Sequence, residues 1–244
     1  MVRATLAVFA TLWAGAAEAA CRLALLLALD VSGSVDEAEY VLQLAGVAQA
    51  LEDSEVRHAL MALPAAPVSL AVFEWSSAGY QREVLGWTSL SEEADIFAVA
   101  AHLRGWRRAV APEATGIGAA LRHAADVFNA GPICWRKTLD VSGDGKNNDW
   151  PLPRDIYADG LLAGVTVNGL IVGQEWLRGG DERMLGVAEL SAYYRANVIR
   201  GPGAFVEVAI GYDDFANAMT RKLLREVSAP ELGGDAPLRR LAER

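Results

Sequence analysis

Residues Asp30–Ser34, with the sequence DVSGS, place one carboxylate and two hydroxyls within one short segment. Hard cations such as Mg²⁺ bind oxygen ligands in near-octahedral geometry and usually keep several waters, so this composition suits a magnesium site. The segment follows the aliphatic run Leu23–Leu29, and ligands of open α/β sheets gather beyond the carboxyl ends of the strands. A structural role is the alternative, because Ser34 and Glu37 have the spacing of a capping box for a helix that begins near Asp36.

Two later segments carry oxygen ligands at the ends of predicted elements. Thr115 opens a predicted helix that runs to Phe128, and Asp144 follows the predicted strand Lys137–Val141. Each has a simpler explanation when taken alone, since threonine is a common helix N-cap and Asp-Gly is a common turn. Their order and their placement favour a site shared with Asp30–Ser34.

The elements that must position these residues alternate along the chain. Apolar runs of strand length alternate with segments of helical period, which predicts an α/β fold with a doubly wound, mostly parallel sheet and helices on both faces. The predicted strands are Leu23–Leu29, Val68–Phe73, Lys137–Val141, Val165–Val172 and Phe205–Ala209, with Glu83–Trp87 as an edge strand. The predicted helices are Asp36–Leu51, Ala94–Leu103 with its start at Ser91, Thr115–Phe128, Asp181–Tyr194 and Asp213–Val227. No internal repeat or linker divides this pattern, so we expect one domain over residues 21–228.

The segment Leu25–Ser34 resembles the metal-ion-dependent adhesion site of von Willebrand factor type A domains. That resemblance implies a Rossmann-like three-layer fold and a divalent metal ion, Mg²⁺ or else Mn²⁺ or Ca²⁺. It also implies direct metal contacts from Ser32, Ser34 and Thr115, and contacts from Asp30 and Asp144 either direct or through water. Ser142 and Gly143 precede Asp144 where Thr-Asp-Gly is more usual. Gly201–Val206 and the closing helix further resemble a bacterial exported branch of the family, which implies no particular activity.

By the same resemblance, the chain is expected to be a binding module and not an enzyme, with a protein or peptide partner that offers a carboxylate to the metal. A phosphatase of the haloacid dehalogenase type is one alternative, with Asp30 as nucleophile and Asp144 and Asp149 at the metal. That chemistry normally needs a second acid two residues after the nucleophile, where this chain has Ser32. A scaffold of the same fold that needs no metal is the other alternative.

The surroundings of the expected site contain arginine and tryptophan, which are favoured in binding hot spots. The segments are His102–Arg108, before Thr115, and Lys146–Trp150, after Asp144. Solvated loops with a tryptophan packed in the core are the alternative. The three histidines are scattered and show no zinc-site spacing.

The start of the chain has the layout of a secretory signal peptide over residues 1–20. Arg3 precedes the apolar run Ala4–Ala16, and small residues follow it. An ordinary first helix and a membrane anchor are the rivals, but Glu18 and Arg22 interrupt the apolar length that a span needs. Glu18 also stands where a lipoprotein signal preceding Cys21 would have an apolar residue. We therefore expect a periplasmic or secreted protein with no stable membrane span in its mature chain, and a loose tail over residues 229–244.

A net charge of −9 and a pI near 4.9 argue against a nucleic-acid partner, because affinity for phosphate backbones needs clustered Lys and Arg. The two cysteines, Cys21 and Cys134, could pair in an oxidising compartment or be buried as small hydrophobes. The sheet order of the resembled family would make the first and fourth strands parallel neighbours, with both cysteines at the end opposite the metal. The resemblance thus implies a Cys21–Cys134 disulfide.

Overall fold

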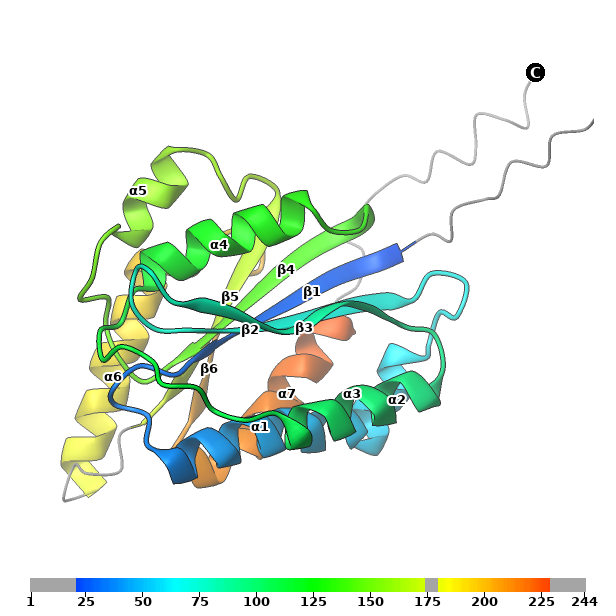
Figure 1. Ribbon diagram of the computed structural model, residues 1–244, viewed down its shortest axis with the longest axis horizontal. Coiled ribbons are helices and arrows are strands. Elements are labelled where there is room, and N and C mark those ends of the chain that lie inside the picture. The colour runs from blue at the N-terminus through cyan, green and yellow to red at the C-terminus, as the bar shows by residue number, and fades with distance from the viewer. Residues whose placement is uncertain (1–20, 174–179, 229–244) are drawn as a thin grey trace, which may run out of the picture.

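The computed structural model describes residues 21–173 and 180–228, so the predicted signal peptide and C-terminal tail lie outside the described residues (Figure 1). Within this part of the chain a single six-stranded sheet has the order β3-β2-β1-β4-β5-β6. Only the β2–β3 pair is antiparallel. The strands are β1 Cys21–Asp30, β2 Val68–Trp75, β3 Gln81–Leu90, β4 Cys134–Gly143, β5 Val165–Val172 and β6 Val206–Ala209.

Helices cover both faces of the sheet, which confirms the predicted fold class. One face carries α1, α2, α3 and α7, and the other carries α4, α5 and α6 (Figure 1). Two short helices, α2 and α5, are additions to the predicted set. The bounds are α1 Glu37–Glu52, α2 Ser54–Leu60, α3 Glu93–Gly105, α4 Ile117–Asn129, α5 Pro153–Ala158, α6 Gly180–Asn197 and α7 Phe215–Val227, with a 3₁₀ turn at Tyr212–Asp214. None of the helices in the described ranges has the length and apolar character required to cross a membrane.

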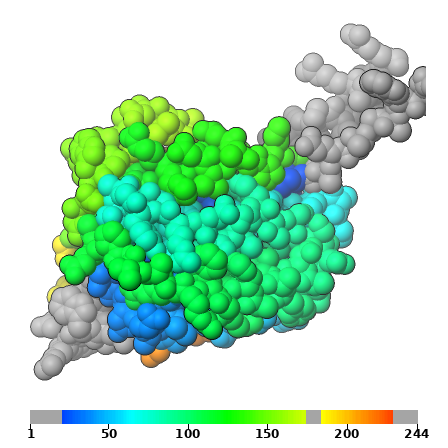
Figure 2. Space-filling model, in the orientation of Figure 1, coloured from blue at the N-terminus to red at the C-terminus, as the bar shows by residue number. Residues whose placement is uncertain are grey.

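The first strand, β1, separates two hydrophobic cores. Because successive side chains of a strand point to opposite faces, its leucines at odd positions pack against α1, α3 and α7, while Ala24, Leu26 and Ala28 pack against α4 and α6. On the face shown in Figure 2, β1 is almost completely covered by later segments. This central burial fixes the position of the residues that follow Asp30.

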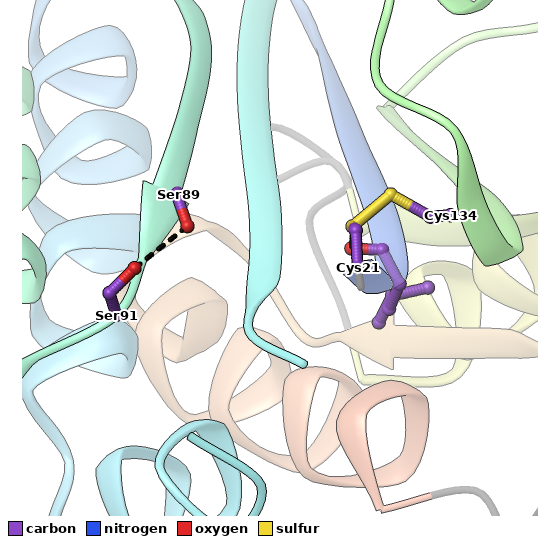
Figure 3. The surroundings of a disulfide bond; sticks show 5 residues. Cys21, Ser89, Ser91 and Cys134 are labelled. Carbon is purple, nitrogen blue, oxygen red and sulfur yellow. Dashed lines mark hydrogen bonds between the residues drawn. A yellow bond between two sulfur atoms is a disulfide. The ribbon is translucent and has the colours of Figure 1, made fainter. Parts of the chain in front are cut away.

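The N-terminal end of β1 is fastened to its neighbours. Cys21 pairs in register with Cys134 of β4, and a disulfide joins them across a Cα–Cα distance of 4.5 Å (Figure 3). The expected pairing is therefore confirmed. The next residue, Arg22, donates to the carbonyl oxygen of Ala59 at 2.7 Å and to that of Val227 at 3.5 Å. The two ends of the described fold thus lie together, at the edge of the sheet where β1 begins.

A buried charge cluster lies between the sheet and α7. The ammonium of Lys222 is 3.0 Å from a carboxylate oxygen of Asp140 in β4 and 2.5 Å from Oε1 of Glu226. Asn168 of β5 donates to the same Glu226 oxygen at 2.7 Å. All three charged side chains are essentially inaccessible to solvent, and burial raises the pKa of Asp140 to about 7. One lysine therefore faces two carboxylates inside the protein.

Candidate metal site

The loop after β1 is held in a tight conformation by its own aspartate. Oδ1 of Asp30 accepts a hydrogen bond from the backbone N–H of Ser32 at 2.8 Å. The backbone N–H of Gly33 donates to the carbonyl oxygen of Glu113 at 3.0 Å, so the loop before α4 lies against this one. A Cβ atom on Gly33 would lie 2.8 Å from Cβ of Glu113, which explains why a residue without a side chain stands there.

Three hydroxyls and a carboxylate meet beyond the ends of β1 and β4. Oγ of Ser32 lies 3.4 Å from Oγ of Ser34 and 3.4 Å from Oγ1 of Thr115. Oγ of Ser34 donates to Oδ1 of Asp144 at 2.6 Å. The structure therefore brings together all five residues, Asp30 included, that the sequence indicated from three separate segments.

The alternative role of Ser34 as a helix cap is wrong. The capping box of α1 consists of Asp36 and Glu39: Glu39 N–H donates to Oδ1 of Asp36 at 2.9 Å, and Asp36 N–H donates to Oε2 of Glu39 at 2.8 Å. The helix begins at Glu37, so the predicted Ser34–Glu37 pair stands two residues too early. The hydroxyl of Ser34 is thereby left for its contact with Asp144.

The site buries two carboxylates close together. Asp30 is fully buried and Asp144 nearly so. Burial raises the pKa of Asp30 to about 8, with a further contribution from the charge of Asp144, and burial also raises the pKa of Asp144. Oδ2 of Asp30 has no hydrogen-bond partner among the described residues. Such concentrated negative charge requires either protons or a cation.

Gly143 and Tyr194 complete the surroundings of Asp30. A Cβ atom on Gly143 would lie 2.6 Å from the hydroxyl oxygen of Tyr194 and 2.9 Å from Oδ2 of Asp30. Gly143 thus leaves the space that the Tyr194 hydroxyl and Oδ2 of Asp30 occupy. The more usual Thr-Asp-Gly is absent here, yet Asp144 still accepts the hydrogen bond from Ser34. Tyr194 lies in α6, far along the chain, and no spacing in the sequence indicated it.

A profile of the DUF1194 family, described as a protein of unknown function, matches residues 20–231. The chain belongs to the DUF1194 family. No curated protein matches it. Solved structures that resemble the DUF1194 chain do so at low sequence identity, so the likeness concerns the fold.

Three of these structures, from two proteins, illustrate the likeness. Proximal thread matrix protein 1 from the mussel byssus has 14% identity and a TM-score of 0.57, over 86% of this chain and 49% of that one. A von Willebrand factor type A protein from Catenulispora acidiphila has 17% identity and a TM-score of 0.55, over 85% of this chain and 43% of that one. The mussel protein has also been solved with a zinc-occupied MIDAS motif, at 15% identity and a TM-score of 0.56. The DUF1194 chain thus has a von Willebrand factor A fold, and it spans less than half the length of these structures.

The donor set of the DUF1194 chain fits a hard divalent cation. Hydroxyl and carboxylate oxygens are the ligands that such ions prefer, and they include Oδ2 of Asp30, which has no partner in the described part of the chain. Within the described ranges, no group of three or more histidine, cysteine or acidic residues could hold a metal ion. Any metal bound at this edge would therefore depend on the serine and threonine hydroxyls.

The loop after β4 braces the loop that carries Thr115. Oδ1 of Asn148 accepts from the backbone N–H of Thr115 at 2.7 Å, and the backbone N–H of Asn148 donates to the carbonyl oxygen of Thr115 at 2.9 Å. Oδ1 of Asn147 accepts from the N–H of Gly118 at 3.0 Å. These asparagines were not foreseen as site residues, yet they fix Thr115 relative to Asp144.

Replacing Asn148 with alanine is expected to cost about 1 kcal/mol of unfolding free energy, because the N–H of Thr115 loses its acceptor. Loss of a residue that orients a ligand should also weaken Mg²⁺ binding about tenfold. Urea denaturation and Mg²⁺ titration measure the two effects. Asn129→Ala, at the exposed end of α4, is the matched control and should change neither quantity. Equal behaviour of the two variants would contradict a bracing role.

Asp149, which the phosphatase alternative places at the metal, has a structural role instead. Oδ2 of Asp149 accepts from the backbone N–H of Ala78 and Oδ1 accepts from that of Trp150, both at 2.8 Å, and these bonds lower the pKa of Asp149. Oδ2 thus holds the loop after β4 against the loop after β2, and Oδ1 stabilises the turn at Trp150 within its own loop. No observation favours the phosphatase assignment.

The two tryptophans near the site behave differently. Trp106 is partly buried against the core, donates from Nε1 to Glu74 at 3.3 Å and lies under the guanidinium of Arg82. Trp150 has 67% of its surface exposed, in the same loop as Asn147 and Asn148. The core-packed alternative therefore describes Trp106, whereas Trp150 is available at the surface.

Proposed function

We propose that the DUF1194 chain is an exported binding module that captures an acidic group of a protein or peptide partner through a divalent metal ion at Asp30, Ser32, Ser34, Thr115 and Asp144. The observation that carries the proposal is the meeting of three hydroxyls and two buried carboxylates from three segments, centred on the 2.6 Å contact between Ser34 and Asp144. A turn and a helix cap would not require this convergence.

Each part of the site has a distinct task in this proposal. The hydroxyls of Ser32, Ser34 and Thr115 would hold the cation, while Asp30 and Asp144 supply the opposing charge, directly or through water. Such an ion offers a coordination position that a carboxylate from a partner can fill. Capture in this way needs no catalysis.

The cysteines support the proposed location of the protein. Disulfides persist in oxidising compartments and are rare in the cytosol, so the Cys21–Cys134 bridge supports export to the periplasm or the exterior. The exposed ring of Trp150 beside the site offers apolar contact area of the kind that binding hot spots use. A partner with an acidic side chain next to an apolar one would suit both features.

Metal binding is tested by thermal unfolding with and without Mg²⁺ or Mn²⁺. A hundredfold excess over Kd contributes about 2.7 kcal/mol, so the Tm should rise by roughly 5–10 °C. Asp30→Ala and Ser32→Ala should each remove this rise. Ser91→Ala, at a serine that follows β3 at the opposite edge of the sheet (Figure 3), should retain it. Absence of any shift with Mg²⁺, Mn²⁺ or Ca²⁺ would favour the metal-free scaffold.

Partner capture is the second half of the same test. Immobilised protein should retain partners from an envelope extract in Mg²⁺ and release them in chelator, and the Asp30→Ala protein should retain none in either condition. Retention that changes neither with chelator nor with Asp30→Ala would overturn the proposed mode of binding. Hydrolysis of an aryl phosphate that depends on Asp30 would replace it with the phosphatase alternative.

A further inference from the structure

A second candidate site lies at the edge of the sheet opposite the metal site. A pocket of about 590 Å³ opens where β4 and β5 begin, between the turn at Gly164, the turn at Arg200–Gly203 and the last turn of α7. Small-molecule sites commonly have volumes of about 300–1,000 Å³, so the pocket is large enough for a metabolite. Neither the fold nor the proposed metal site accounts for it.

The lining of this pocket is basic, although the chain as a whole has a net charge of −9. Arg136, Lys137, Arg200 and Arg225 line it. Within the described ranges, Lys137, Arg200 and Arg225 form no ion pair. Arg22, nearby, has its pKa lowered by burial and by the charge of Arg136, which reflects the concentration of positive charge here. Lys137, Arg200 and Arg225, which have no carboxylate partner among the described residues, favour an anionic ligand.

Aromatic rings position two of these cations. The guanidinium of Arg225 lies 3.8 Å from the centroid of Phe205, and that of Arg200 lies 4.6 Å from the centroid of Tyr157. Stacking of this kind restricts a guanidinium while leaving its N–H groups available for hydrogen bonds. Phosphate and carboxylate groups are the anions whose geometry suits such donors.

The lining of the pocket also includes one carboxylate, which already has a cation as its partner. Glu226 lines the pocket, and Oε1 of this side chain is occupied by Lys222 and Asn168. Oε2 of Glu226 is buried and has no hydrogen-bond partner among the described residues. A ligand therefore meets the cations of this lining, and not the buried carboxylate oxygens.

We propose that this pocket binds a small organic anion whose phosphate or carboxylate group contacts Arg200 and Arg225. The site is independent of the proposed metal site, because it lies at the starts of β4 and β5, whereas Asp144 follows the end of β4.

Isothermal titration calorimetry on the purified protein tests the proposal with four probes: glycerol 3-phosphate, gluconate, inorganic phosphate and glycerol. At least one of the two hydroxylated anions should bind with a Kd of about 1 mM or tighter, and more tightly than inorganic phosphate, whereas glycerol should not bind. Which anion binds identifies the charged group. Absence of saturable binding by both anions at concentrations on the order of 10 mM would overturn the proposal.

Variants locate the binding in this pocket. Arg200→Gln and Arg225→Gln should each weaken binding roughly tenfold, which is the scale of one charged hydrogen bond. Arg154→Gln removes the same charge from the exposed start of α5 and should leave the Kd unchanged. Chelator should also leave it unchanged, which separates this outcome from failure of the proposed metal site. Equal affinity in all three variants would place the ligand elsewhere and refute the assignment.

Discussion

Replacing Lys222 with methionine should lower the unfolding free energy by about 3–5 kcal/mol at pH 8, because the change leaves two buried carboxylates without their cation. The ammonium lies 3.0 Å from Asp140 and 2.5 Å from Glu226, and none of the three side chains reaches solvent. Urea denaturation measures the loss. Lys146→Met, at an exposed lysine, should change the same quantity by less than about 1 kcal/mol.

The pH dependence of this loss gives the electrostatic explanation its own test. A carboxyl whose pKa is higher in the folded than in the unfolded state binds protons on folding, so the folded state gains stability as the pH falls below the folded pKa. In the wild-type protein burial raises the pKa of Asp140 to about 7 although the charge of Lys222 lowers it, so the pKa should be higher still when Lys222 is replaced. The Lys222→Met protein should therefore recover part of its stability between pH 8 and pH 5. A loss that is the same at both values would point to packing instead of charge.

Removing the disulfide with Cys21→Ser and Cys134→Ser together is expected to cost about 4–5 kcal/mol. The bridge closes a loop across a sequence separation of 113, and the stabilisation from restricting the unfolded chain grows with loop length. Urea denaturation of wild-type protein with and without dithiothreitol should reproduce the difference, and the reductant should not affect the double variant. A double variant as stable as the oxidised wild type would refute the expectation. The rise in Tm with Mg²⁺ should persist in it, because the bridge lies at the other edge of the sheet.

The sequence predicted the fold well where the hydrophobic pattern was long. The strand Val165–Val172 was predicted with the bounds that the structure gives, because its β-branched residues are bounded by glycines on both sides. The helices α2 and α5 were missed because each is too short to show a periodic pattern. Their formation depends on tertiary burial of Val56, Leu60 and Ile156, which no local rule anticipates.

The candidate site was predictable to the extent that its residues stand at the ends of elements. Asp30 ends one strand, Ser32 and Ser34 follow it, and Asp144 follows another strand, so the topology of a parallel sheet brings them together. The contacts of Asn148 with Thr115, of Glu113 with Gly33 and of Tyr194 near Asp30 depend on loop paths and packing between distant segments. The predicted helix cap was wrong for a simpler reason. Asp36 and Glu39 have the same spacing as Ser34 and Glu37, and the Asp36–Glu39 pair is the one that caps the helix.

The proximity of Arg22 to Val227 has a practical consequence for handling the protein. A carrier, tag or surface linkage joined to either end of the fold would leave from the same side, and the loops that hold Asp30 and Thr115 would point the other way. Immobilisation through either end should consequently leave those loops open to molecules arriving from solution. Joining the two ends through a short linker and cutting the chain at an exposed loop should likewise preserve them.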